Sequence, residues 1–285
     1  MSDRVDLEAV LQRAHSLMER LEGMLPPPAP PIQWDAPAFR WRQGQLQSIP
    51  EVSPLSLDDL LHIGRPRELL ERNTRQFLAG RPANNALLWG ARGTGKSSLM
   101  RALLTRYASE GLRLVQVDAH ELVDLPRIVA PLRDRSERFV LFADDLSFEA
   151  NEPAYKALKA ALDGDLEATP ENVIIYATSN RRHLMPERSA DNLEAKRVDD
   201  EIHPGEAVEE KVSLSERFGL WVAFHPFSQA QYLEVVRHWL AHLGGGPMTE
   251  AARREALQYA LLRGSRSGRV AWQFARDWTG RQGEA

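Results

Sequence analysis

The residues from Gly90 to Ser97 have the types and spacing of a phosphate-binding loop. They fit the pattern G-x-x-x-x-G-K-[ST] in full, with an apolar stretch before it and an amphipathic stretch after it. Glycines in such a loop permit positive φ angles, so that backbone N–H groups can point inward at a phosphate. The Lys96 ammonium is expected to reach the β- and γ-phosphates, and the Ser97 hydroxyl to coordinate Mg²⁺. We predict that ATP is bound by Gly90, Arg92, Gly93, Thr94, Gly95, Lys96, Ser97 and Ser98.

A pair of acids follows a second apolar stretch. Phe139–Ala143 is apolar throughout, which is typical of a buried strand, and Asp144 and Asp145 come directly after it. In open α/β sheets, ligands bind at the carboxyl ends of the strands. We predict that Asp144 binds the metal or its water and that Asp145 orients or deprotonates the attacking water. The alternative for Asp145 is a cap on the following helix. Many P-loop ATPases have Glu at the position of Asp145, and Asp is one methylene shorter. Basal hydrolysis of ATP is therefore expected to be slow or to depend on a partner.

The elements that position these residues alternate between strand and helix. Strands are predicted at Asn85–Gly90, Leu112–Asp118, Phe139–Asp144, Val173–Ser179 and Gly219–His225, with helices at Ser97–Glu110 and Pro153–Leu162 between them. This alternation predicts an α/β domain with a parallel sheet covered on both faces, over residues 51–226. From Ser228 onward the pattern is purely helical, at Gln229–Leu243, Thr249–Arg263 and Gly268–Thr279. Residues 227–285 are therefore predicted to form an all-helical lid domain.

The first 50 residues differ in pattern from this core. Residues 5–25 place apolar residues at helical spacing, and the proline-rich stretch Pro26–Pro31 ends that helix and acts as a stiff spacer. We therefore assign residues 1–50 to an N-terminal helix and linker. Trp34 and the segment Phe39–Arg42 either pack their aromatic rings on the main domain or dock a partner.

The segment from Ser189 to Val212 is acidic, with eight acids, three bases and few apolar residues. Such a composition predicts an exposed loop. The alternative is a segment that becomes ordered on contact with a neighbour or substrate. A small basic cluster, Arg181 to His183, precedes it and is expected to form a solvated loop; the alternative is contact with phosphate, nucleic acid or an acidic partner.

The order of motifs resembles that of the AAA+ superfamily of P-loop ATPases. It runs from the loop through Asp144-Asp145, Thr178-Ser179-Asn180 and Ser215-Glu216-Arg217-Phe218 to a helical lid. More narrowly, the segments Leu87–Ser98 and Tyr176–Leu184 are similar to a bacterial family of predicted ATPases labelled as of unknown function. This narrower resemblance covers roughly Leu57 to Trp278 and leaves out the first 50 residues.

The resemblance implies catalytic roles for two residues beyond the loop and the acids. Asn180 takes the sensor-1 position, where its amide holds the nucleophilic water; the alternative is a residue that only forms a turn at a strand end. Arg217 resembles the arginine finger that one subunit projects into the site of its neighbour. Its alternative is a structural ion pair with a local acid such as Glu216.

The resemblance also implies contacts from the lid and from the segment before the loop. Arg269 resembles sensor 2, which reaches from a lid helix to the phosphates, and Arg266 is the competing candidate. Ile63 and Gly64 match the place where AAA+ proteins wrap the adenine.

Composition restricts the partners. The formal net charge of −4 gives no global attraction to nucleic acid, which is not favoured as a partner. The chain has no cysteine, which excludes disulfides, Cys-ligated zinc, iron–sulfur clusters and thiol nucleophiles. The N-terminus is acidic, so no secretory signal is expected, and no apolar run approaches the roughly 18 residues of a membrane span. We expect a cytoplasmic protein without membrane contact.

The predicted function is hydrolysis of ATP coupled to remodelling of an unidentified protein or protein–DNA partner. The alternative is a nucleotide-gated binding module or loader with little turnover of its own. An arginine finger implies a homo-oligomer, a ring or filament that is built through Arg217.

Overall fold

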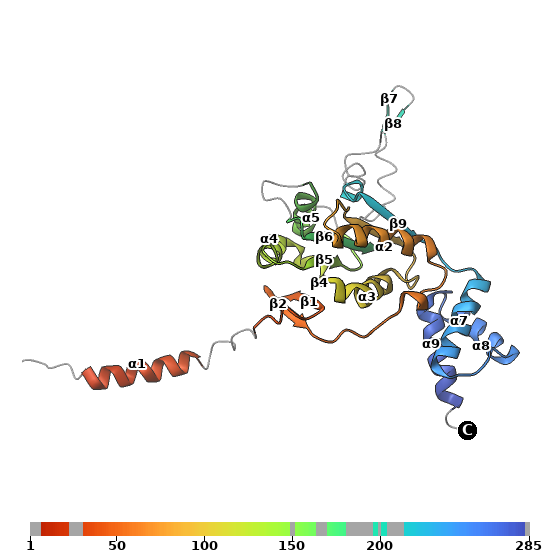
Figure 1. Cartoon of the computed structure of the whole chain (residues 1–285), viewed down its shortest axis with the longest axis horizontal. Coiled ribbons are helices and arrows are strands. Elements are labelled where there is room, and N and C mark those ends of the chain that lie inside the picture. The colour runs from red at the N-terminus through yellow and green to blue at the C-terminus, as the bar shows by residue number, and fades with distance from the viewer. Residues whose placement is uncertain are drawn as a thin grey trace, which may run out of the picture. The chain divides into compact units, whose positions relative to one another are not determined.

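The structure is a computed structural model that describes residues 7–22, 31–148, 152–163, 170–180, 196–198, 201–203 and 214–282 (Figure 1). The chain divides into two compact units, Met1–Ile32 and Gln33–Ala285. The first contains helix α1 (Leu7–Glu22), as residues 5–25 predict. The second contains every other described element.

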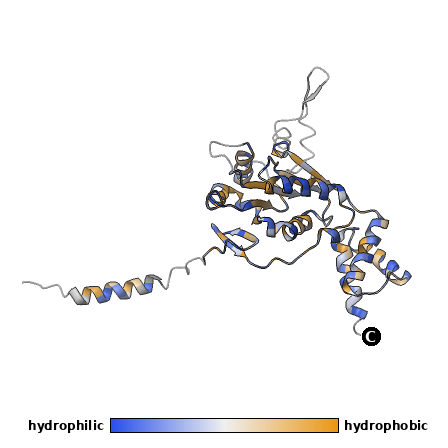
Figure 2. Ribbon diagram, viewed as in Figure 1, coloured by the Kyte–Doolittle hydropathy of each residue, from blue (hydrophilic) through white to orange (hydrophobic). Residues whose placement is uncertain are grey.

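A seven-stranded sheet forms the centre of the second unit, in the order β2-β1-β4-β5-β6-β3-β9. Its strands are β1 (Ala38–Arg42), β2 (Gln45–Ile49), β3 (Ala86–Gly90), β4 (Leu112–Val117), β5 (Arg138–Ala143), β6 (Val173–Ser179) and β9 (Leu220–Phe224). All pairings are parallel except the β1–β2 hairpin. The strands are mostly hydrophobic in colour in Figure 2, as expected for a parallel sheet with both faces covered. The predicted α/β parallel-sheet class is confirmed.

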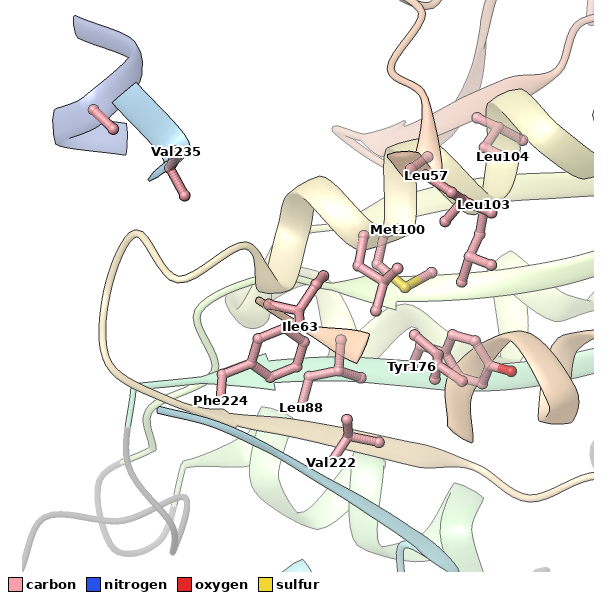
Figure 3. Close-up of a cluster of buried hydrophobic side chains, with 14 of the residues drawn as sticks. Leu57, Ile63, Leu88, Met100, Leu103, Leu104, Tyr176, Val222, Phe224 and Val235 are labelled. Atoms are coloured by element: carbon pink, nitrogen blue, oxygen red, sulfur yellow. The ribbon is translucent and has the colours of Figure 1, made fainter. Parts of the chain in front are cut away.

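Helices α2 (Gly64–Leu78) and α3 (Lys96–Tyr107) contribute to the main hydrophobic core. Figure 3 shows part of this core, with Leu88 of β3, Tyr176 of β6 and Met100 of α3 close together. This part also contains α4 (Leu125–Val129) and α5 (Pro153–Asp163), with short 3-10 turns at Leu57–Asp59, Ala108–Glu110, Ala119–Asp124 and Ala130–Leu132. Every residue of β6 is buried, so both faces of the sheet are covered there.

A buried polar network fixes α2 against the sheet. The Tyr176 hydroxyl accepts a hydrogen bond from Asn73 Nδ2 at 2.9 Å and lies 3.1 Å from Thr74 Oγ1. Asn73 also exchanges two hydrogen bonds with the backbone of Asn84, which leads into β3. Burial raises the pKa of Tyr176 to about 12, so this hydroxyl stays neutral and remains available to the network. The network thereby holds the strand that carries the phosphate-binding loop.

The assignment of residues 1–50 to a helix and linker is wrong for residues 38–49. These residues form the β1–β2 hairpin, and β1 pairs with β4 at the edge of the main sheet. Phe39 and Trp41 are buried, and the Phe39 ring packs against Trp34 and Phe139. The aromatic residues therefore pack on the main domain. The hairpin forms because apolar residues alternate with arginines, with one face of β1 covered and the other exposed.

Three helices follow the last strand: α7 (Gln229–Leu243), α8 (Glu250–Leu262) and α9 (Gly268–Gln282). Ser228 begins α7 with a capping box, and the Thr249 side chain caps α8. The Tyr232 hydroxyl donates a hydrogen bond to the Ala256 carbonyl at 3.0 Å and joins α7 to α8. The described chain is helical between Ser228 and Gln282, as the sequence predicts, and we call α7–α9 the lid helices.

Two predictions fall largely outside the described residues. The basic cluster of residues 181–183 lies outside them entirely. Of the acidic segment, the structure describes only β7 (Lys196–Val198) and β8 (Glu201–His203), which pair antiparallel. No helix in the described part of the chain is long and apolar enough to cross a membrane.

Candidate active site

The phosphate-binding loop joins β3 to α3 and needs two of its glycines for close contacts. Gly90 has a φ of 133°, and a Cβ on it would lie 2.0 Å from the Phe224 carbonyl oxygen of β9. Gly93 has a φ of 74°, and a Cβ on it would lie 2.7 Å from Ser267 Oγ in the lid. Any side chain at either position would therefore displace backbone or push the lid away.

The amino end of α3 is open to an anion. Its N-cap residue, Gly95, is left-handed and provides no side-chain cap. The first N–H groups of a helix have no partner within the helix, and they carry the positive end of its dipole. Backbone N–H groups in this arrangement bind phosphate.

Lys96 is folded into its own loop. Its ammonium donates to the carbonyl oxygens of Gly90 at 2.6 Å and Ala91 at 2.9 Å, and to Asn180 Oδ1 at 3.1 Å. The residue is only 7% exposed. Burial lowers the pKa of Lys96, and the negative charges of Asp145 and Asp144 oppose this shift. The buried Lys96 ammonium could therefore also bind an anion such as a phosphate.

Ser97 and Asp144 meet as the sequence predicts for a metal site. The Ser97 hydroxyl donates to Asp144 Oδ1 at 2.7 Å. Thr178 of β6 donates to the same oxygen at 2.6 Å, and its hydroxyl accepts from the backbone N–H of Asp145 at 2.8 Å. Thr178 is buried, with 1% of its surface exposed, and its hydroxyl holds both acids in place through these hydrogen bonds. Thr178 belongs to the motif Thr178-Ser179-Asn180, but no role for it is predicted from the sequence. A polar residue inside a buried apolar strand was the available signal.

Asp145 points to Asn180 rather than to a helix. It has a φ of 54°, and its carboxylate accepts a hydrogen bond from Asn180 Nδ2. Its other oxygen lies 3.5 Å from Arg92 Nη2. Helix α5 begins only at Pro153, so Asp145 does not cap it. The structure brings together the two residues that the sequence assigns to the attacking water.

The lid touches the phosphate-binding loop through its backbone. The Gly93 carbonyl accepts hydrogen bonds from the N–H groups of Gly268 at 2.9 Å and Arg269 at 3.4 Å, at the start of α9. Gly268 and Arg269 also line the cleft described below. Arg266 instead lines a separate hollow beside α8.

A cleft of about 1580 Å³ surrounds the loop, between the sheet and the lid helices. Its lining contains the charged and polar residues Arg92, Lys96, Ser97, Asp144, Asp145, Thr178, Asn180 and Arg269. Trp239 and Trp272 of the lid line it as well, with ring centroids 4.6 Å apart. These aromatic residues were not singled out from the sequence, because residues at helical spacing are usually core.

The two residues predicted to wrap an adenine lie beside the cleft. Ile63 is buried under the loop, where its Cδ1 would lie 3.9 Å from a Cβ on Gly95 (Figure 3). Gly64 begins α2. Neither belongs to the cleft lining, although Leu61 does. Two side-chain pairs instead connect this segment to α7: His62 with Glu234 at 2.9 Å, and His238 with Asp59 at 3.0 Å.

Arg217 lies away from the cleft in its own chain. Its Nε donates to the carboxylate of Asp163 at the end of α5, and Arg217 is not part of the cleft lining. An intrachain ion pair was the alternative left open by the sequence, with Glu216 as the suggested acid. The structure pairs Arg217 with Asp163.

The donor set fits a magnesium ion. Mg²⁺ prefers oxygen ligands and keeps several waters, so one carboxylate with a hydroxyl suffices beside a phosphate. Ser97 and Asp144 provide these two oxygens, 2.7 Å apart. The described residues contain no group of three or more His, Cys, Asp or Glu side chains that could hold a metal, which argues against an all-protein cage in this part of the chain.

Comparisons with known proteins identify the fold. A family model described as "Protein of unknown function (DUF815)" matches residues 34–282. Among solved structures, a point mutant of Thermotoga maritima RuvB is similar at 17% identity and a TM-score of 0.54, over 79% of this chain and 65% of that one. The Aeropyrum pernix ORC1 protein in complex with DNA is similar at 15% identity and a TM-score of 0.52, over 74% and 57%. The chain therefore spans less than two thirds of either protein.

These likenesses confirm the AAA+ fold that the sequence resemblance implies. The comparison with curated proteins gives no match.

We predict that Thr178→Val weakens Mg²⁺-dependent binding of ATP about tenfold, because residues that orient metal ligands typically contribute that much. Thr178→Ser keeps the hydroxyl and should bind normally. ATP titrations of both variants with Mg²⁺ and with EDTA check this. If Val and Ser behave alike, Thr178 does not orient Asp144.

Proposed function

The chain belongs to the DUF815 family, and we propose that it binds ATP with Mg²⁺ in the cleft beneath its lid helices and hydrolyses it to ADP and phosphate. The hydrogen bond between Ser97 and Asp144 carries this proposal. It joins the loop to the acid that follows β5, across the intervening strand β6, at the carboxyl edge of the sheet and beside Lys96 and the open end of α3. A chance match to the loop pattern would not explain why Ser97 and Asp144 are hydrogen-bonded.

Binding uses groups that are already gathered around the loop. The N–H groups at the start of α3 would hold phosphate oxygens, and Lys96 would exchange its carbonyl partners for the β- and γ-phosphates. Arg269 and Arg92 line the same cleft and would add positive charge from the lid and the loop. We favour Arg269 over Arg266 as the lid sensor, because only Arg269 lines this cleft.

Ser97 and Asp144 would hold Mg²⁺, which neutralises charge on the phosphates. Asp145 would accept a proton from the attacking water or orient it. Asn180 would hold that water, since its amide contacts both Asp145 and Lys96. General bases contribute about 10²–10⁴-fold to such reactions.

The proposed assembly depends on the role of Arg217. Paired with Asp163 and absent from the cleft lining of its own chain, it would act on the site of a neighbouring subunit after releasing Asp163. Such a contact is heterologous and builds a homo-oligomeric ring or filament. We infer that turnover in this assembly remodels a protein or protein–DNA partner.

Lys96→Ala should lower ATP affinity about 10- to 100-fold, because a charge-assisted hydrogen bond contributes about 1.5–3 kcal/mol. Lys156→Ala, which removes an exposed lysine on α5, is the control and should bind ATP normally. Titration with a fluorescent ATP analogue measures both. Unchanged affinity in Lys96→Ala would argue against the phosphate site.

Asp145→Asn should keep Mg²⁺-dependent ATP binding and slow hydrolysis about 100-fold or more. Asp144→Ala should weaken binding itself, because it removes a metal ligand. Phosphate release and ATP titration, measured on both variants, separate the two roles. A wild-type rate in Asp145→Asn would move the catalytic base elsewhere. If the wild-type chain binds ATP but does not turn it over, it is a nucleotide-gated module.

Arg217→Ala should bind ATP but lose about 10³-fold in rate, the lower range known for arginine fingers. The decisive measurement mixes it with Lys96→Ala. Mixed assemblies contain interfaces that combine an intact loop with an intact Arg217, so activity should partly recover. Mixtures that co-assemble but stay inactive would show that Arg217 has no role in the site of a neighbouring subunit.

A further inference from the structure

A second hollow, of about 840 Å³, lies between the phosphate-binding loop and α8. Its apolar lining comes from Pro226, Phe227, Leu257, Ala260 and Leu261. Arg92 and Thr94 of the loop line both this hollow and the nucleotide cleft. A molecule bound here would therefore touch the loop that holds the nucleotide. We call this hollow the basic groove.

The charged lining of the groove is strongly unbalanced. It consists of four arginines, Arg92, Arg253, Arg254 and Arg266, and a single acid, Glu250. Glu250 pairs with Arg253 at 3.0 Å, and Arg92 faces Asp145 at 3.5 Å. Arg254 and Arg266 are exposed and form no ion pair within the described part of the chain. The groove thus offers positive charge to an acidic occupant.

The groove also offers an apolar contact. Leu261 and Leu262 at the end of α8 are 81% and 87% exposed, and Leu261 lines the groove. Exposed apolar surface of this kind can be covered by a binding partner, and here it lies at the edge of the groove. The occupant that fits carries several acids with apolar residues among them.

We propose that the basic groove receives the acidic segment, residues 189–212, of a second copy of this chain. That segment has eight acids and three bases, with Leu193, Ile202, Val208 and Val212 between them. Its charge and its apolar residues complement the two features of the groove, and complementary charges steer and select partners. The inference rests on the proposed homo-oligomer and gives its subunit interface a second contact besides Arg217.

The attachment of the last acids of the segment favours a neighbour over the same subunit. The segment rejoins the described chain at Leu214, which is buried before the amino end of β9. Pro226 and Phe227 of the groove follow the carboxyl end of the same strand. In the sequence, Glu209 and Glu210 come shortly before the end of β9 that is opposite the groove of the same chain.

Charge reversal tests the proposal. Arg254→Glu places a like charge opposite the segment, and Glu209→Lys with Glu210→Lys reverses the segment itself. Arg237→Glu, an exposed arginine of α7 outside both hollows, makes the same charge change as a control. Sedimentation velocity of the full-length chain at low ionic strength, where screening is weakest, measures self-association. ATP titration of the same samples tests the proposed function separately.

Arg254→Glu and the double Lys variant should each weaken self-association about tenfold, and Arg237→Glu should leave it unchanged. Equimolar mixing of the two weakened variants should restore association, because each intact groove then meets an intact segment on another copy. Three results would overturn the inference: equal effects of Arg254→Glu and Arg237→Glu, no recovery on mixing, or a wild-type chain that stays monomeric. A monomer that still binds ATP would leave the nucleotide site standing while the groove assignment fails.

Discussion

The register of the parallel strands is the constraint on which the site depends. Leu88 of β3 pairs with Thr178 of β6, and Ala143 of β5 pairs with Ala177. This register brings Asp144 level with Thr178, and β3 leads into the loop on the other side of β6. Because parallel strands end at one edge, the loop, the two acids and Asn180 meet there. A slip of one residue between β5 and β6 would turn Thr178 away from Asp144.

The lid is connected to this edge at several points. The Gly93 carbonyl accepts the backbone N–H groups of Gly268 and Arg269, and only a glycine at 93 leaves room for Ser267. On the other side of the cleft, His238 contacts Asp59. A nucleotide that changed the conformation of the loop would therefore move the start of α9 as well. The two are joined by backbone hydrogen bonds, so a side-chain rotation cannot compensate for the change.

Much of this architecture could be predicted from the sequence because it depends on local pattern. Val173–Ser179 and Gln229–Leu243 have the observed limits, since an apolar run and a capped amphipathic helix define their own ends. The β1–β2 hairpin was missed because its strands are short and follow a proline-rich stretch. The alternation of Phe39 and Trp41 with arginines was the signal for it.

Contacts between distant segments could not be predicted in this way. Thr178 touches both acids only because of the register between β5 and β6, and spacing along the chain contains no such information. The partner of Arg217 is Asp163 rather than the neighbouring Glu216, because α5 ends beside it in space. The residue types of the site were therefore predictable, but their supporting partners were not.

The phosphate-binding loop separates the nucleotide cleft from the basic groove, and this position has a thermodynamic consequence. Arg92 and Thr94 line both hollows, and the Asp145 carboxylate faces Arg92. Any occupant of the groove that attracts Arg92 competes with Asp145 for this arginine. A nucleotide that attracts Arg92 likewise weakens the interaction between Arg92 and the occupant of the groove. Linkage requires the effect to be equal in both directions. The proposed assembly and the proposed ATP site would therefore regulate each other through one arginine, with no need for a longer path through the core.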